Sequence, residues 1–133
     1  MKRMLPMLLL LSFALTGCDA SATLPETNTY RQITMQEAVE MMEKEENYII
    51  LDVRTHEEFA AGHIPGAIVV PNETIGAEEI PQLPDKNQLI MVYCRSGNRS
   101  KQASDKLVKL GYTNIVEFGG IIDWPGETIS GIE

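Results

Sequence analysis

The residues of this sequence best suited to chemistry lie together at positions 94–99. They read Cys94, Arg95, Ser96, Gly97, Asn98 and Arg99. A cysteine thiolate is a strong nucleophile, and a helix that begins just after it offers unpaired backbone N–H groups that favour negative charge. A glycine in a short loop lets several N–H groups converge on one point. The pattern therefore predicts a nucleophilic cysteine beside a binding site for an oxyanion, with two arginines supplying positive charge.

We predict that Cys94 is the nucleophile and that the residues after it bind the substrate. The predicted substrate-binding residues are Arg95, Ser96, Gly97, Asn98 and Arg99. The alternative is a buried structural thiol, because free cysteines are often buried. The composition favours the functional interpretation, since a chain with a formal net charge of −8 places two arginines and a glycine within the five residues after this cysteine.

Alternating apolar strands and amphipathic helices are expected to position this loop. The spacing predicts helices over 34–45, 55–62 and 100–110, strands over 31–33, 48–53, 67–70, 88–93 and 114–118, and one or two helical turns within 74–83. Capping boxes at Thr34 and Thr55 open the first two helices. The strands are apolar on both faces, as buried parallel strands are. We therefore expect an α/β fold with a mainly parallel central sheet flanked by helices on both faces.

Two further polar groups are expected near the same edge of the sheet, where ligands bind in such folds. Asp52 and Arg54 lie where the strand over 48–53 ends. We expect them to form an ion pair that braces the loop, with a direct catalytic role as the alternative. His63 lies in a turn and is expected to brace it; a thiolate stabilised by backbone N–H groups does not need a histidine base.

Composition excludes several other functions. Apart from Cys18, the only cysteine and histidines are Cys94, His56 and His63, and they lack the spacing of metal ligands. The sequence contains no nucleotide-binding glycine fingerprint. We therefore expect no metal and no cofactor. The acidic balance also disfavours nucleic acid, whose phosphates require basic patches.

The N-terminal segment predicts export and lipid attachment. Two basic residues precede an apolar run over 4–15, which is about 12 residues long, whereas a membrane-spanning helix needs roughly 20. The following residues, Leu15, Thr16, Gly17 and Cys18, resemble the lipobox of bacterial lipoproteins. This resemblance implies that Cys18 is lipidated and becomes the first residue of the mature chain. An ordinary secretory signal is the alternative.

These features divide the chain into three parts. We predict a lipoprotein signal peptide over 1–17, a lipidated tether over 18–29 and one domain over 30–133. The expected location is the bacterial cell envelope, on the extracytoplasmic side and, in a Gram-negative cell, facing the periplasm. We expect the domain to be a monomer held at the membrane by the lipid on Cys18.

Three motifs along the domain resemble those of the rhodanese family. The first runs from Ile50 to Arg54 and continues through residues 58–59 and 62–67 to Pro71. The second is the loop over 94–99. The third is Gly119 and Gly120, followed by Trp124 and Gly126. The resemblance covers residues 30 to 128, and three motifs in order are much more specific than any one of them.

The resemblance implies a sulfurtransferase of the rhodanese fold. In this family the cysteine at the position of Cys94 attacks the outer sulfur of thiosulfate or of a persulfide donor and becomes a persulfide. A nucleophilic acceptor, cyanide or a thiol, then takes the terminal sulfur. Such covalent catalysis divides one transfer into two steps. The implied partners are therefore a small anionic sulfur donor and a thiol or cyanide acceptor.

Two other functions fit the same residues. Phosphatases and arsenate reductases related to this fold also use a loop from cysteine to arginine, but with five intervening residues, whereas four separate Cys94 from Arg99. The shorter loop favours sulfur over a tetrahedral phosphate. A tethered domain that binds a partner, or that exchanges thiols, is the other alternative. The presence of the cysteine, the glycine and both arginines favours catalysis.

Overall fold

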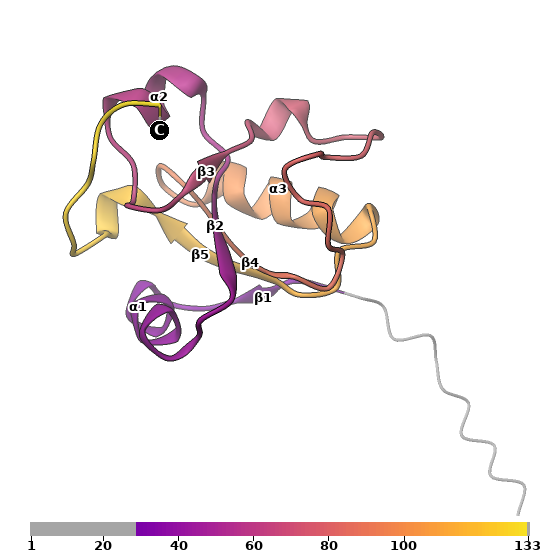
Figure 1. Cartoon of the computed structure of the whole chain (residues 1–133), viewed down its shortest axis with the longest axis horizontal. Helices are drawn as coiled ribbons and strands as arrows, with labels where there is room; N and C mark the ends of the chain where they lie inside the picture. The colour runs from indigo at the N-terminus through magenta and orange to yellow at the C-terminus, as the bar shows by residue number, and fades with distance from the viewer. Residues whose placement is uncertain (1–28, 133) are drawn as a thin grey trace, which may run out of the picture.

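The computed structural model describes residues 29–132, which form one parallel sheet with helices on both faces (Figure 1). The elements are β1 (Arg31–Gln32), α1 (Met35–Lys44), β2 (Tyr48–Asp52), α2 (His56–Ala61), β3 (Ile68–Val69), η1 (Asn72–Thr74), β4 (Leu89–Cys94), α3 (Asn98–Lys109), β5 (Ile115–Gly120) and η2 (Ile121–Asp123). The strand order is β1-β5-β4-β2-β3, and every pairing is parallel. The predicted fold class is therefore confirmed.

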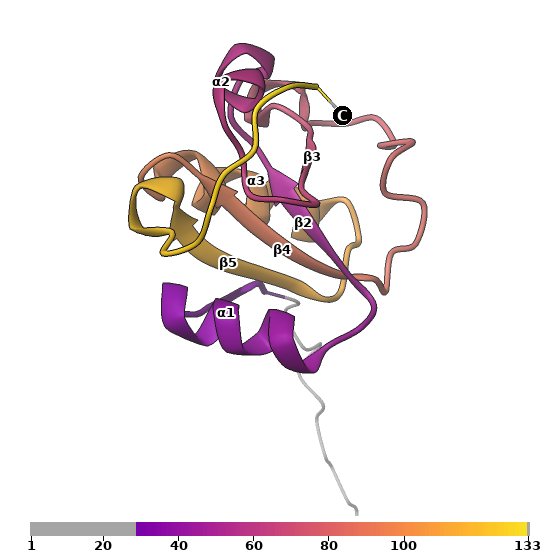
Figure 2. The ribbon, with the colours of Figure 1, turned by 60° about the vertical axis from the view of Figure 1, so that its left-hand side comes forward.

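Two apolar cores lie on opposite faces of the sheet. Side chains alternate along β4, so that Val92 and Cys94 point toward α3, whereas Met91 and Tyr93 point toward α1 and α2. Figure 2 shows α1 and α3 separated by the strands. The catalytic candidate thus lies on the α3 face, and the opposite face of the same strand end is covered by α2 and the turn that follows it.

The predicted helices and strands are confirmed to within a few residues, with one exception. The capping boxes form at Thr34 and Thr55, which precede α1 and α2. The helical turns predicted within 74–83 are wrong: η1 ends at Thr74, and the following residues are irregular. Ile75, Ile80 and Leu83 are buried in the core on the α3 face. These apolar residues therefore anchor a packed loop, in which prolines at 81 and 84 disfavour a helix.

The C-terminal segment returns along α2 and closes the edge of the site. His63 and Ile129 exchange backbone hydrogen bonds of 2.8 and 2.9 Å, and Gly131 donates to the carbonyl of Ala60. Figure 2 shows this segment beside α2. In the described part of the chain, no helix is long and apolar enough to cross a membrane. The predicted signal peptide, the tether and lipidated Cys18 lie outside the described residues.

Candidate active site

Cys94 is the last residue of β4 and is 1% exposed. The backbone N–H of Gly97 donates to its Sγ over 2.9 Å. Gly97 has a φ of 110°, in the left-handed region that glycine adopts without strain, and it precedes α3 as an N-cap that makes no side-chain hydrogen bond. The sulfur therefore lies at the N-terminal end of a helix, where backbone N–H groups and the helix dipole stabilise negative charge.

The turn into α3 is shorter than the sequence predicts. The predicted loop extends to Arg99, but α3 begins at Asn98, so only residues 95–97 connect the strand to the helix. Asn98 and Arg99 belong to the first helical turn. Ser96 and Gly97 face a cleft between the loop and the start of α1, whereas Arg95 faces a different cleft beside α2. The predicted binding residues are thus divided between two sides of the loop.

Gly119 and Gly120 allow β5 to pass directly beneath this loop. Val92 pairs with Glu117 and Cys94 pairs with Gly120, so β5 carries one extra residue between the two pairs. Gly119 takes up this bulge with a φ of 97°. A Cβ on Gly120 would overlap the carbonyl group of Arg95 and lie 2.5 Å from the nitrogen of Ser96. Only glycine fits there, which explains the paired glycines of the third motif.

Substitution of Gly120 by alanine is expected to displace the Cys94 loop and to lower both activity and stability. Overlap with backbone cannot be relieved by a side-chain rotation, and forced packing typically costs about 1–3 kcal/mol. Urea unfolding and sulfur-transfer assays would measure the two effects. Gly76→Ala is the matched control, since nothing lies within 4 Å of a Cβ there. Equal behaviour of the two variants would contradict the steric role of Gly120.

The guanidinium of Arg99 is not available to bind an anion at the loop, because it forms a two-pronged ion pair with Glu58 of α2. The two N–O distances are 2.7 and 3.0 Å, and both side chains are about one third exposed. These hydrogen bonds raise the pKa of Arg99 and lower the pKa of Glu58 to about 2. The charge of Cys94 also raises the pKa of Arg99, so the guanidinium lies within electrostatic range of the thiolate. Sequence reasoning placed Glu58 in the Thr55 capping box, which forms, but missed its contact with Arg99.

The Glu58–Arg99 pair predicts a specific loss of stability in acid. The folded-state pKa of Glu58 lies below its ordinary value of 4.5, so the pair stabilises the fold above that pH and loses this contribution as the pH falls toward 2. Urea unfolding of the wild type and Glu58→Gln should differ most at neutral pH and converge between pH 4.5 and 2. A difference that stayed constant over that range would show that the charge of Glu58 is not the cause.

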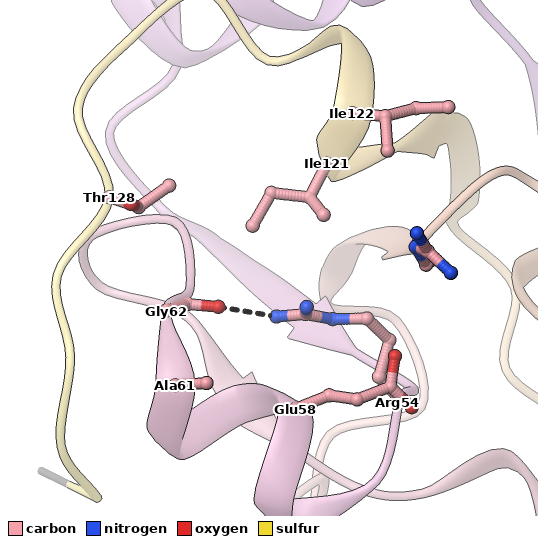
Figure 3. Close-up of a pocket in the computed structure, with 8 residues that line it drawn as sticks. Arg54, Glu58, Ala61, Gly62, Ile121, Ile122 and Thr128 are labelled. Atoms are coloured by element: carbon pink, nitrogen blue, oxygen red, sulfur yellow. Dashed lines mark hydrogen bonds between the residues drawn. The ribbon is translucent and has the colours of Figure 1, made fainter.

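A cleft of about 460 Å³ opens between the loop, α2 and the C-terminal segment (Figure 3). Its walls combine apolar side chains with charged ones: Arg54, Arg95 and Glu58, of which Glu58 is paired with Arg99. Within residues 29–132, Arg95 is exposed and its guanidinium makes no hydrogen bond or ion pair. The cleft therefore offers one available cation beside an apolar wall, which suits an anionic substrate with an apolar part.

Asp52 and Arg54 form a buried ion pair that ties the strand ends together. Arg54 donates to both Asp52 oxygens, at 2.7 to 3.1 Å. It also donates to the carbonyl of Gly62 at 2.7 Å (Figure 3). Tyr93 donates to Asp52 over 2.6 Å and accepts from the N–H of Ile64. The network joins β2, β4 and the turn after α2, on the opposite face of the sheet from Cys94.

The charges of this network are fixed by its contacts. Burial opposes the charge on Arg54, but hydrogen bonds and attraction to Asp52 raise its pKa above the ordinary value. Burial, together with the Asp52 hydrogen bond, raises the pKa of the Tyr93 hydroxyl well above 10. Tyr93 therefore stays protonated and Arg54 stays charged throughout the physiological range. The hydrogen bonds that these two side chains donate are therefore kept across that range.

The side chain of His63 contacts Phe59, at the end of α2. Its ring stacks on Phe59 with centroids 3.7 Å apart, and its Nδ1 lies 2.8 Å from the Phe59 carbonyl, which requires Nδ1 to carry a proton. None of its hydrogen bonds reaches Cys94. Within residues 29–132, no group of three or more Cys, His, Asp or Glu residues could hold a metal ion.

Two polar residues behind Cys94 were missed by sequence reasoning. Ser100 and Glu117 are 0% and 3% exposed, and the hydroxyl of Ser100 lies 3.4 Å from Sγ and 2.7 Å from a Glu117 oxygen. The available signal was the glutamate itself, because a charged residue interrupts the apolar run over 115–118. Its burial beside the candidate nucleophile depends on the pairing of β4 with β5.

The sequence model of the rhodanese-like domain matches residues 34–126. The chain belongs to the rhodanese-like domain family. The match includes β4, the Cys94 loop that follows it, β5 and the turn after α2. The motifs identified in the sequence thus coincide with the extent of a single family domain.

Individual relatives point to the same general activity. The chain is 37% identical over 73 residues to thiosulfate sulfurtransferase PspE of Escherichia coli, covering 55% of this chain and 70% of that protein. It is 40% identical over 82 residues to a sulfurtransferase of Allochromatium vinosum, covering 59% and 73%. Thiosulfate sulfurtransferase 16 of Arabidopsis thaliana is 39% identical over 85 residues, covering 56% and 71%. These relatives support sulfur transfer as the general activity of this rhodanese-like domain.

Solved structures show the same fold. A rhodanese with anions from E. coli superimposes with a TM-score of 0.58 at 33% identity, covering 63% of this chain and 99% of that one. A rhodanese-related protein from Thermoplasma volcanium superimposes with a TM-score of 0.63 at 28% identity, covering 78% of this chain and 100% of that one. The parallel sheet and the placement of its helices are therefore those of the rhodanese family.

Proposed function

We propose that this protein moves sulfane sulfur from thiosulfate or a persulfide donor to cyanide or a thiol through a persulfide on Cys94. The observation that carries the proposal is the position of the Cys94 sulfur, which ends a buried strand at the N-terminus of α3 and accepts the Gly97 N–H at 2.9 Å. Such a site stabilises a thiolate and, after transfer, the charge of a persulfide. The sulfurtransferase relatives support the same chemistry.

The first half-reaction loads the cysteine. The Cys94 thiolate attacks the outer sulfur of thiosulfate, a new S–S bond forms, and the original S–S bond breaks with its electron pair leaving on sulfite. Arg95 is the exposed cation beside the loop and would steer the anionic donor toward it. The N–H groups at the start of α3 would hold the charge of the terminal sulfur.

The second half-reaction removes the terminal sulfur from the Cys94 persulfide. The acceptor, cyanide or a thiolate, attacks the terminal sulfur, and the S–S bond breaks with its electron pair returning to Cys94. Cyanide becomes thiocyanate, whereas a thiolate becomes a persulfide. The cleft beside α2, at about 460 Å³, has more room than a small inorganic anion requires, so it supports an organic thiol or persulfide as a natural substrate.

The Glu58–Arg99 pair argues against phosphoester or arsenate chemistry. A phosphatase-type site would need the arginine at the end of the loop to be available for two-pronged contact with the anion. Arg99 instead makes that contact with Glu58, at 2.7 and 3.0 Å. Together with the short loop, this pairing favours a substrate that interacts with one sulfur atom over one that needs a tetrahedral cradle.

We further propose that the domain works at the bacterial cell envelope. The support is the lipobox-like sequence that ends at Cys18, after a basic and apolar leader. A lipid on Cys18 would hold the domain at the membrane surface, while the polar segment over 19–29 would separate it from the lipid.

Thiocyanate formation by residues 19–133 tests the proposal most directly. The reduced protein is mixed with thiosulfate, its intact mass is recorded, and cyanide is then added. The expected result is a gain of one sulfur atom that disappears as thiocyanate forms, with both absent after alkylation of Cys94. Absence of mass gain with thiosulfate and with persulfide donors would overturn the proposal, and turnover of a phosphoester or arsenate would establish the rival function.

A further inference from the structure

Glu117 is a buried carboxylate that the sulfur-transfer steps do not use. It is 3% exposed, on the same face of the sheet as Cys94, and its Oε1 accepts the Ser100 hydroxyl at 2.7 Å and the Gly119 N–H at 2.8 Å. The amide of Gln32 lies 3.5 Å from its other oxygen. Burying a carboxylate is costly, and here it lies one hydroxyl away from a nucleophilic sulfur.

The three side chains form a continuous hydrogen-bonded chain. Cys94 Sγ lies 3.4 Å from the Ser100 oxygen, which lies 2.7 Å from Glu117. Ser100 has one hydroxyl proton, and the carboxylate is its shortest and only charged acceptor, so the proton is directed to Glu117. The lone pairs of Ser100 then face Sγ and can accept a proton from the thiol, not donate one to a thiolate.

We propose that Glu117 is a positioning residue that controls the protonation of Cys94 through Ser100. The ionised carboxylate retains the Ser100 proton and thereby holds Cys94 as a thiol. When the thiolate forms, the S–H proton passes to Ser100 while the Ser100 proton passes to Glu117. One thiol and one carboxylate become one thiolate and one carboxylic acid, so charge and electrons balance without a further reactant.

Other charged groups near the chain do not replace Glu117. Glu37 of α1 and Lys101 of α3 line the cleft of about 380 Å³ at whose edge Glu117 lies, and both are exposed. Arg99 lies within electrostatic range of Cys94, but it is paired with Glu58. Glu117 is the group that a direct hydrogen-bonded path connects to the sulfur.

This inference deepens the proposed function, because the thiolate is the species that attacks the donor. The loop N–H groups favour the thiolate, whereas Glu117 opposes a second negative charge beside it.

The rate of Cys94 alkylation by iodoacetamide as a function of pH tests the proposal without a sulfur donor. Glu117→Gln keeps an oxygen that accepts from Ser100 and Gly119 but carries no charge. The midpoint of the profile is expected to move to lower pH by about one unit or more, which is roughly a tenfold faster alkylation below the wild-type midpoint. Glu37→Gln is the matched control, because it removes a carboxylate from the same cleft without touching Ser100.

The Ser100→Ala variant tests whether Glu117 acts on Cys94 through Ser100. In that variant, adding Glu117→Gln should shift the midpoint of the alkylation profile by less than half as much, since the connecting hydroxyl is gone. An unchanged or higher midpoint in Glu117→Gln, or a full shift in the absence of Ser100, would overturn the proposal. Glu117→Leu, which suits an apolar strand, provides a second test should the glutamine variant fold poorly. If the shift occurs but the wild type transfers no sulfur, the proposal that Glu117 controls the protonation of Cys94 is supported and the sulfurtransferase proposal fails.

Discussion

Replacement of Cys94 by serine is expected to abolish thiocyanate formation and the mass gain of one sulfur atom. The serine oxygen can accept the Gly97 N–H in place of Sγ, so the loop should keep its geometry. A serine hydroxyl cannot form a persulfide, and the reaction should fall to the rate measured without protein. Because Cys94 is 1% exposed and serine is close to it in size, the free energy of unfolding should change little compared with the loss of activity.

The control for this variant moves the thiol elsewhere. Ser104 is fully buried on α3, and Ser104→Cys in the Cys94→Ser background restores a thiol away from the loop N–H groups. That double variant should remain inactive, since a thiol without the anion site is a poor nucleophile at neutral pH. Any gain of sulfur mass in Cys94→Ser would place the sulfur on another residue and remove Cys94 from the mechanism.

Replacement of Asp52 by alanine is expected to destabilise the fold by about 3–5 kcal/mol, because it leaves a buried charge without its partner. Asp52 is fully buried and accepts hydrogen bonds from Arg54 and Tyr93. Since domains of this kind are stabilised by only about 5–15 kcal/mol, much of the stability should be lost. Urea unfolding at neutral pH measures the change, and sulfur transfer should fall with the folded fraction.

Two further variants make this result interpretable. Asp105→Ala breaks the exposed pair with Lys109, one helical turn away, and should cost no more than about 0.5 kcal/mol. Asp52→Asn keeps an acceptor for Tyr93 and should lie between the two, which also serves if the alanine variant does not fold. A cost for Asp52→Ala as small as that for Asp105→Ala would show that the buried network is not what holds the strand ends.

The local features of the site could be predicted from the sequence. A β-branched, apolar run that ends in a cysteine, followed by a glycine and a helical pattern, places Cys94 at a strand end and a helix start, whatever the rest of the chain does. The capping boxes at Thr34 and Thr55 likewise depend only on residues three positions apart. Short-range geometry fixes such features, because the hydrogen bonds that form them lie within one turn of chain.

Only the tertiary structure decided which distant groups meet at Cys94. Arg99 binds Glu58 and Tyr93 binds Asp52, each across 41 positions, and Ser100 meets Glu117 across 17. Those contacts depend on the order β1-β5-β4-β2-β3, which places β2 and β5 on either side of β4. Hydrophobic periodicity reports which face of a strand is buried but not which strand lies beside it. The sequence therefore indicated Cys94 as the candidate nucleophile at a strand end, whereas strand pairing determined that Arg99 pairs with Glu58 and that Ser100 and Glu117 lie beside the sulfur.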